Sequence, residues 1–221
     1  MCDRSRTPAL VDEIAAFLLS GCCSGCDLPG TLLCRWCRDV LVADPVHRTT
    51  PGGMPVVAAL TYEGVPARCI RRLKEEGETL LARPLGAALR VAIDEFLPGT
   101  GRARLVPVPT SRAAFRRRGY RVPDLLIRRA GLSVSRLLAP TRTTADQRGL
   151  DIAERRRNVA QSMRVRHARG GRDILLVDDV ITTGATLDEA ARALTAAGNR
   201  MLGAVTLAAT PRHREFTSNA S

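Results

Sequence analysis

Two adjacent aspartates followed by a turn rich in threonine are the residues best suited to chemistry in this 221-residue chain. The uncharged apolar run 174–177 is typical of a buried parallel strand, and it delivers Asp178 and Asp179 to the sheet edge where α/β proteins bind ligands. The turn that follows consists of Thr182, Thr183, Gly184, Ala185 and Thr186. Its N–H groups, its hydroxyls and the dipole of the next helix suit a phosphate monoester. The segment therefore predicts a site for a ribose 5′-phosphate, with the carboxylates accepting hydrogen bonds from the ribose hydroxyls.

A purely structural interpretation of the same residues is available. The two aspartates could simply end a strand, and the threonines could simply cap a helix. The agreement of strand, acid pair, hydroxyl-rich turn and helix in chain order favours the binding site. A Walker-type phosphate loop is excluded, because no Gly-Lys-Ser or Gly-Lys-Thr follows a glycine-rich turn.

A second constellation consists of two Cys-x2-Cys pairs, Cys23 with Cys26 and Cys34 with Cys37. Four thiolates at this spacing can close a tetrahedral Zn²⁺ site, because each tight turn supplies two ligands. Cys22 could replace Cys23 as a ligand, and the alternative to a structural zinc site is a set of reduced thiols. A redox role is disfavoured, because a thioredoxin-type pair opens a helix after a strand.

The charge of the chain is concentrated in its middle. Residues 102–172 contain 19 arginines and 4 acids, whereas the net charge of the whole chain is +12. A basic middle suits polyanions such as phosphorylated ligands or nucleic acid. Only 7 aromatic residues are present, which is a poor supply for a platform that stacks single-stranded bases.

Elements that alternate between strand and helix must position these residues. Hydrophobic patterning predicts strands over 56–62, 105–109, 133–138, 174–177 and 201–208, and helices over 67–75, 84–96, 120–130 and 186–197. Thr186 is the candidate N-cap of the last helix, with Glu189 three residues on and Gly198 just past its end. The irregular, arginine-rich stretch 139–158 is typical of a functional or mobile loop. Strand–helix–strand order in the last third predicts a parallel sheet in an α/β fold.

The chain is expected to divide into five parts: an N-terminal helix (1–22), a cysteine unit (23–44), a linker rich in proline and glycine (45–55), an α/β domain (56–211) and a flexible tail (212–221). No apolar run is long enough for a membrane span. The stretch 9–20 contains Asp12 and Glu13, which favours an amphipathic helix over a signal peptide. We expect a cytoplasmic globular protein, in which the cysteines stay reduced.

The 13 residues from Ile174 to Thr186 resemble the 5-phosphoribosyl-1-pyrophosphate (PRPP) motif of type I phosphoribosyltransferases. The chain from about 23 to 210 resembles the ComF/GntX family, which implies a parallel-sheet type I phosphoribosyltransferase domain preceded by a small four-cysteine zinc ribbon. Supporting segments are Val106-Pro107-Val108-Pro109, Arg116-Arg117-Arg118-Gly119-Tyr120, Gln147-Arg148-Gly149-Leu150 and Glu154-Arg155-Arg156-Arg157-Asn158-Val159. The family usually reads Arg-Gly-Phe-Asn-Gln where this chain has Arg118-Gly119-Tyr120-Arg121-Val122, so the acceptor side is where this chain departs.

The resemblance implies a role for each matching segment. Asp178 and Asp179 would hold the ribose hydroxyls, directly or through water on Mg²⁺, and the turn 182–186 would cradle the 5′-phosphate. The pyrophosphate, bridged by Mg²⁺, would meet Lys74, Thr110, Ser111 and Arg112. A mobile hood carrying Arg148, Arg155 and Asn158 would close over the site.

Three functions remain open on the sequence. The first is a Mg²⁺-dependent phosphoribosyltransferase that uses PRPP and an unknown acceptor. The second is a protein that handles single-stranded DNA during DNA uptake and keeps a PRPP-type pocket with little or no turnover, because the family is associated with natural transformation. The third is a pocket that binds a nucleotide for regulation only.

Overall fold

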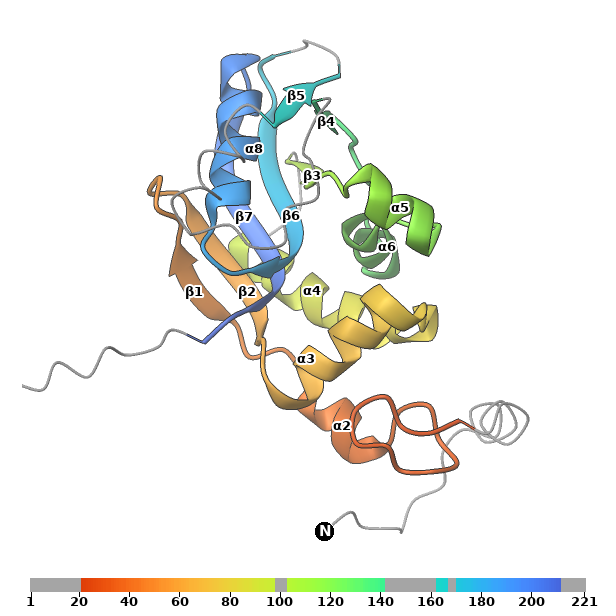
Figure 1. Ribbon diagram of the computed structural model, residues 1–221. Coiled ribbons are helices and arrows are strands. Elements are labelled where there is room, and N and C mark those ends of the chain that lie inside the picture. Colours follow the sequence, from red (N-terminus) through yellow and green to blue (C-terminus); the bar gives the residue numbers. More distant parts are fainter. Residues whose placement is uncertain (1–20, 98–102, 142–161, 167–169, 212–221) are drawn as a thin grey trace, which may run out of the picture.

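The computed structural model describes residues 21–97, 103–141, 162–166 and 170–211. Its centre is a five-stranded sheet (Figure 1). In spatial order the strands are β1 (Val46–Thr49), β2 (Pro55–Thr61), β7 (Arg200–Ala209), β6 (Asp173–Ile181) and β3 (Arg104–Pro107). The last four are parallel, and β1 runs antiparallel to β2. The predicted α/β fold with a parallel sheet is therefore confirmed.

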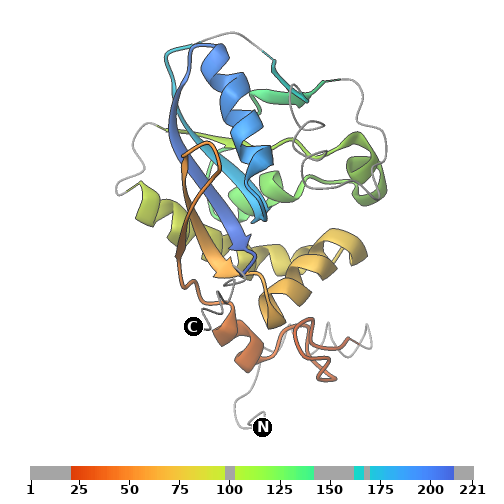
Figure 2. The same ribbon diagram turned by 60° about the vertical axis from the view of Figure 1, so that its left-hand side comes forward.

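Helices cover both faces of the sheet (Figures 1 and 2). On one face α3 (Gly64–Arg71), α4 (Ala82–Phe96) and α6 (Val122–Arg129) share a core with Leu175 and Val177 of β6. On the other face α8 (Ala185–Ala196) packs on Ile174 and Leu176. Because neighbouring strand residues point to opposite faces, one uncharged run in β6 supplies both cores.

The shorter elements surround this framework. α3 continues directly into a π-helical turn, η1 (Arg72–Glu76), which ends at Gly77 with φ 77° and is followed by η2 (Thr79–Leu81). The cysteine unit contains α2 (Arg35–Val40), and α5 (Arg112–Arg118) follows β3. A two-stranded ladder pairs β4 (Leu138–Pro140) with β5 (Met163–Val165) beyond the edge of the main sheet.

Two expectations for the framework are wrong. The stretch 45–55, taken for a linker, contains β1, which pairs with β2 through its backbone. No residue of β1 is buried, so the strand leaves no apolar alternation in the sequence. The strand expected over 133–138 is also misplaced: β4 begins only at Leu138, where it finds its partner β5.

The start of α8 also differs from expectation. Its N-cap is Gly184, with φ 82°, and not Thr186, which lies exposed inside the first turn. A left-handed residue is needed there to swing the chain from β6 into the helix, and glycine adopts it without strain. Glu189, expected to complete a capping box, is buried and instead accepts a hydrogen bond from the amide of Met163 at 3.1 Å, which ties β5 to the helix.

Several expectations fall outside the described ranges. They concern residues 1–20 of the N-terminal helix, the tail 212–221 and the hood residues Arg148, Arg155 and Asn158. Within the part of the chain that the structure describes, no helix combines the length and the apolar character that crossing a membrane requires.

Candidate phosphosugar site

The acid pair lies near the end of β6, the strand between β7 and β3. Asp179 forms an ion pair with Lys74, with 2.7 Å between Nζ and Oδ1. Lys74 stands in the π-helical turn η1, an irregularity that frequently marks functional sites. Tyr120 holds the same turn, because its hydroxyl donates a hydrogen bond to the carbonyl of Leu73. The structure thus brings together two predicted site residues that are 105 positions apart.

Asp178 lies in a different electrostatic environment from its neighbour. Its Oδ1 accepts a hydrogen bond from the amide of Asp179 at 2.8 Å. Burial, followed by the charge of Asp179, raises the pKa of Asp178 from 3.8 to about 8, against the opposing effects of that amide and of Lys74. A carboxyl perturbed by desolvation and by a like charge at the end of a central strand is a typical functional-site signature.

The threonine turn follows directly. Thr182 and Thr183 are exposed, while Gly184 is buried beneath the turn between β1 and β2. A Cβ on Gly184 would lie 3.1 Å from Cγ2 of Thr50 and 3.2 Å from Cδ of Pro51. The turn 182–186 therefore packs on one side against the turn between β1 and β2, and its hydroxyl groups face solvent on the other side.

Sequence reasoning missed the contact that fixes this backing turn. Asp188, in the first turn of α8, accepts a hydrogen bond from the amide of Gly52 at 2.9 Å. A Cβ on Gly52 would lie only 2.8 Å from the same carboxylate, so the approach requires glycine. The cluster of proline and glycine at 51–53 was the available signal, but it indicates a turn and not the helix against which the turn packs.

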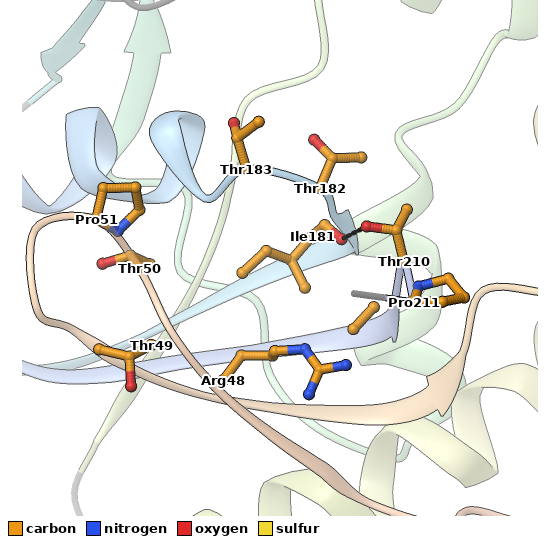
Figure 3. Close-up of a pocket in the computed structure, with 10 residues that line it drawn as sticks. Arg48, Thr49, Thr50, Pro51, Ile181, Thr182, Thr183, Thr210 and Pro211 are labelled. Atoms are coloured by element: carbon orange, nitrogen blue, oxygen red, sulfur yellow. Dashed lines mark hydrogen bonds between the residues drawn. The ribbon is translucent and has the colours of Figure 1, made fainter. Parts of the chain in front are cut away.

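A cavity of about 470 Å³ opens beside the threonine turn (Figure 3). Its walls are the end of β1 and its turn, the turn after β6, and the end of β7. The lining residues are Arg48, Thr49, Thr50, Pro51, Ile181, Thr182, Thr183, Ala209, Thr210 and Pro211. Arg48 is the one charged residue among them, and Figure 3 shows it across the space from Thr182. The hollow therefore suits a polar ligand with anionic character.

Of the four residues expected on the pyrophosphate side, Lys74 lies in η1, and the other three, Thr110, Ser111 and Arg112, follow β3, which is the neighbour of β6. Parallel strands bring both loops to the same edge of the sheet. Ser111 caps α5, accepting a hydrogen bond from the amide of Ala114 at 3.2 Å. Thr110 and Arg112 line a second cavity that shares no lining residue with the first. A pyrophosphate role for these three residues stays a prediction.

The four cysteines meet in one cluster. Sγ atoms of Cys23, Cys26, Cys34 and Cys37 all lie within 4.8 Å of one another, whereas Cys22 is exposed and outside the group. The 3.7 Å between Sγ of Cys26 and Sγ of Cys34 matches the edge of a sulfur tetrahedron around zinc, about 3.8 Å for Zn–S bonds of about 2.3 Å. The donor set therefore fits a structural zinc ion.

The local backbone supports this cluster. Although burial alone would raise it, hydrogen bonds from backbone amides, first that of Cys34, lower the pKa of Cys23 to about 7. A Cβ on Gly25 would lie 2.5 Å from Sγ of Cys37, so the first turn can wrap the thiols only with glycine there.

The cysteine unit is fastened to the helix that carries Lys74. Arg68 donates to the carbonyl of Gly25 at 3.0 Å and pairs with Asp27 at 2.9 Å. Arg72 pairs with the same aspartate at 2.7 Å and with Glu78 at 3.2 Å. Buried cysteines of the unit share a core with α3 and α4. The unit is thus packed against α3 and η1 and not merely tethered.

Raising the pH is expected to lower the free energy of unfolding of the ligand-free protein between pH 3.8, the ordinary pKa of Asp178, and pH about 8, its raised value. The folded chain holds this proton more tightly than the unfolded chain, so the contribution is complete below the lower value and is lost as the pH approaches the upper one. Urea unfolding across this range measures the slope. Asp178→Asn should flatten it; an unchanged slope in the variant would contradict the assignment to Asp178.

Comparison with known proteins agrees with this geometry. The model of the phosphoribosyl transferase domain family matches residues 117–220, a range that includes the acid pair and the threonine turn. The chain therefore contains a phosphoribosyl transferase-like domain, preceded by a cluster of four cysteines.

Curated relatives of this chain include proteins named for DNA utilization and for competence. The DNA utilization protein YhgH of Escherichia coli O157:H7 is 29% identical over 183 residues, which cover 78% of this chain and 77% of that protein. Competence protein F of Haemophilus influenzae is 27% identical over 194 residues, covering 79% and 84%. These homologues confirm the predicted resemblance to the ComF family.

One solved structure of adenine phosphoribosyltransferase shares 12% identity and a TM-score of 0.43, covering 79% of this chain and 89% of its own. The similarity to phosphoribosyl transferases is shown by the family model and by the motif at the end of β6.

Proposed function

We propose that this protein binds PRPP at the end of β6 and transfers its phosphoribosyl group to an acceptor, with release of pyrophosphate. The observation that carries the proposal is the ion pair of Lys74 with Asp179 beside an open threonine turn. A cation, two carboxylates and the N-terminus of α8, which could bind an anion, lie at one edge of the sheet, and this supports the proposal.

Each group has a task in such a transfer. The amides of the turn 182–186 would hold the 5′-phosphate, while Asp178 and Asp179 would accept hydrogen bonds from the ribose hydroxyls. As the bond from C1 of the ribose to pyrophosphate breaks, positive charge develops on the ring, and fixed carboxylates nearby stabilise it. Lys74 balances the charge of the acid pair until the substrate is bound.

The proposed cofactor is Mg²⁺, bound together with PRPP. Mg²⁺ takes oxygen ligands and is commonly bound through carboxylates and substrate phosphates, and the acid pair offers carboxylate oxygens. When bound, Mg²⁺ would neutralise charge on the leaving pyrophosphate. A cytoplasmic location and a structural zinc ion in the four-cysteine cluster belong to the same proposal.

Thr183→Ala is expected to weaken PRPP binding about 10-fold, because a hydrogen bond to a charged group contributes about 1.5–3 kcal/mol. Calorimetric titration with PRPP and Mg²⁺ measures the change. Thr195→Ala is the matched control, since Thr195 is exposed at the far end of the same helix and should leave binding unchanged. Absence of PRPP binding by the wild type, or equal affinity of Thr183→Ala, would overturn the proposal.

A second candidate function is the handling of single-stranded DNA. The names of the relatives, DNA utilization protein and Competence protein F, favour it, as does the arginine-rich middle of the chain. Binding of a labelled single strand should then fall steeply with salt as counterions are released. PRPP turnover and strand binding are measured independently, so each function can fail without the other.

A further inference from the structure

The second cavity, of about 340 Å³, is lined by residues of α5, α6 and the β4–β5 ladder and by the segment after β3, and by no residue of the threonine turn. Six arginines line it: Arg112, Arg116, Arg121, Arg136, Arg164 and Arg166. The single acid among the lining residues is Asp124. Like charges concentrate there at an electrostatic cost that an anionic ligand would relieve. The volume lies within the range of small-molecule sites and exceeds that of a lone phosphate.

Three of these guanidinium groups have no internal partner. Within the described ranges, the side chains of Arg112, Arg116 and Arg164 form no hydrogen bond or ion pair, and all three residues are exposed. By contrast, Arg136 is paired with Asp124, and Arg166 donates to the carbonyl of Leu138 at 3.2 Å. The unpartnered groups come from α5 and β5, on two sides of the same space. They can therefore converge on one phosphate.

Asp124 supplies an unfilled acceptor in the same cavity. The residue is only 4% exposed, its Oδ2 accepts a hydrogen bond from Arg136, and its Oδ1 has no partner among the described residues. A buried carboxylate oxygen left without a donor is costly, so a ligand that brings an N–H group would stabilise it. The cavity thus needs a donor in its buried part and an anion at its exposed rim.

A flat surface completes the cavity. The guanidinium of Arg121 stacks on the ring of Phe115, with 4.3 Å from Cζ to the ring centroid, and both residues line the space. Such a stacked pair offers a planar face to an aromatic base.

We propose that this cavity binds a nucleotide whose base carries an amino group, with the phosphate on the arginines and the amino group on Asp124. A carboxylate accepts from N4 of cytosine in the same manner. The nucleotide can be free or part of a single strand, since both present this chemistry. No residue of the threonine turn takes part, so the nucleotide and the 5′-phosphate of PRPP have separate sites, whereas Thr110 and Arg112, predicted on the pyrophosphate side, line this cavity as well.

Cytidine and uridine monophosphate provide the sharpest test, because they differ at position 4 by an amino group against an oxygen. We expect calorimetry to give about 10-fold tighter binding of cytidine monophosphate. Asp124→Asn keeps an oxygen for Arg136 and turns an amide donor toward the ligand, so it should reverse the preference toward uridine monophosphate. Equal binding of the two nucleotides by the wild type, or no binding of either, would overturn the inference.

Variants at exposed positions control for misfolding and for net charge. The double variant R116A/R164A should weaken both nucleotides about 10-fold and leave their ratio and PRPP binding unchanged. R71A/R83A removes the same charge from exposed positions on α3 and α4 and should change nothing. Equal losses in the two double variants would show that bulk charge binds the nucleotide and would refute the cavity as the site.

Binding of oligonucleotides distinguishes a free nucleotide from a nucleotide within a single strand as the occupant of the cavity. Tighter binding of oligodeoxycytidine than of cytidine monophosphate, with oligothymidine weaker, would support a strand as the occupant. Equal affinity per nucleotide would support the free nucleotide. Oligodeoxycytidine and oligothymidine binding equally well would contradict recognition by Asp124.

Discussion

Gly184→Val is expected to weaken PRPP binding about 100-fold, which corresponds to the loss of about two hydrogen bonds to a charged group. The backbone of Gly184 has φ 82°, and a Cβ would press on Thr50 and Pro51 at 3.1–3.2 Å. Relief of that clash must move either the backing turn or the amides of the phosphate turn. We also expect a loss of about 1–3 kcal/mol in unfolding free energy from the left-handed conformation. Calorimetry with PRPP and thermal unfolding measure the two effects.

Gly77→Val is the matched control for this prediction. Gly77 has φ 77°, yet a Cβ there would meet nothing within 4 Å. The variant should show a similar loss of stability and retain PRPP binding. If both variants bind PRPP equally well, the backing of the phosphate turn by residues 50–51 has no role in binding.

Cys37→Ser is expected to abolish binding of one zinc ion per chain and to destabilise the protein. Cys37 is fully buried among the other three thiols, so a serine hydroxyl leaves the tetrahedron with three good ligands. If free zinc is present at about 1,000 times its dissociation constant, losing the ion lowers the free energy of unfolding by about 4 kcal/mol. This corresponds to a fall on the order of 10 °C in the unfolding midpoint. Metal analysis and thermal scans of the purified protein measure both.

Cys22→Ser tests whether the effect is specific. Cys22 is adjacent to Cys23 in sequence but exposed and outside the cluster. Its substitution should leave zinc content and the unfolding midpoint unchanged. A wild type free of zinc, or equal zinc in both variants, would show that the cluster holds reduced thiols and not a metal.

The sequence predicted the features that are local. The strand over 174–177, the acid pair and the turn after it are contiguous, so periodicity and residue type alone located them. The spacing of the cysteines likewise indicated a shared site before any fold was known. In both cases the chemistry depends on residues that lie within 15 positions of one another.

Contacts between distant segments could not be predicted in this way. Asp188 contacts Gly52 across 136 positions, and neither segment contains a sequence signal that indicates its partner. Tyr120 reaches the carbonyl of Leu73, although the sequence indicated only that its segment departs from the usual motif. The arginine cavity was visible as an excess of charge, but its single unfilled acceptor at Asp124 depends on how α6 packs against the residues before β4. Packing of this kind follows from the tertiary fold and has no local signature.

The contacts between the cysteine unit and η1 couple the unit to the acid pair. Arg72 holds Asp27 of the unit, and Lys74, two residues later on the same helix, holds Asp179. Removing the cysteine unit would expose the apolar side of α3 to solvent. It would also leave Arg72 without Asp27, two positions from the lysine at the acid pair. The chain near residue 44 is therefore not a boundary between independent modules, because a cut there would separate parts that share a core and an ion pair.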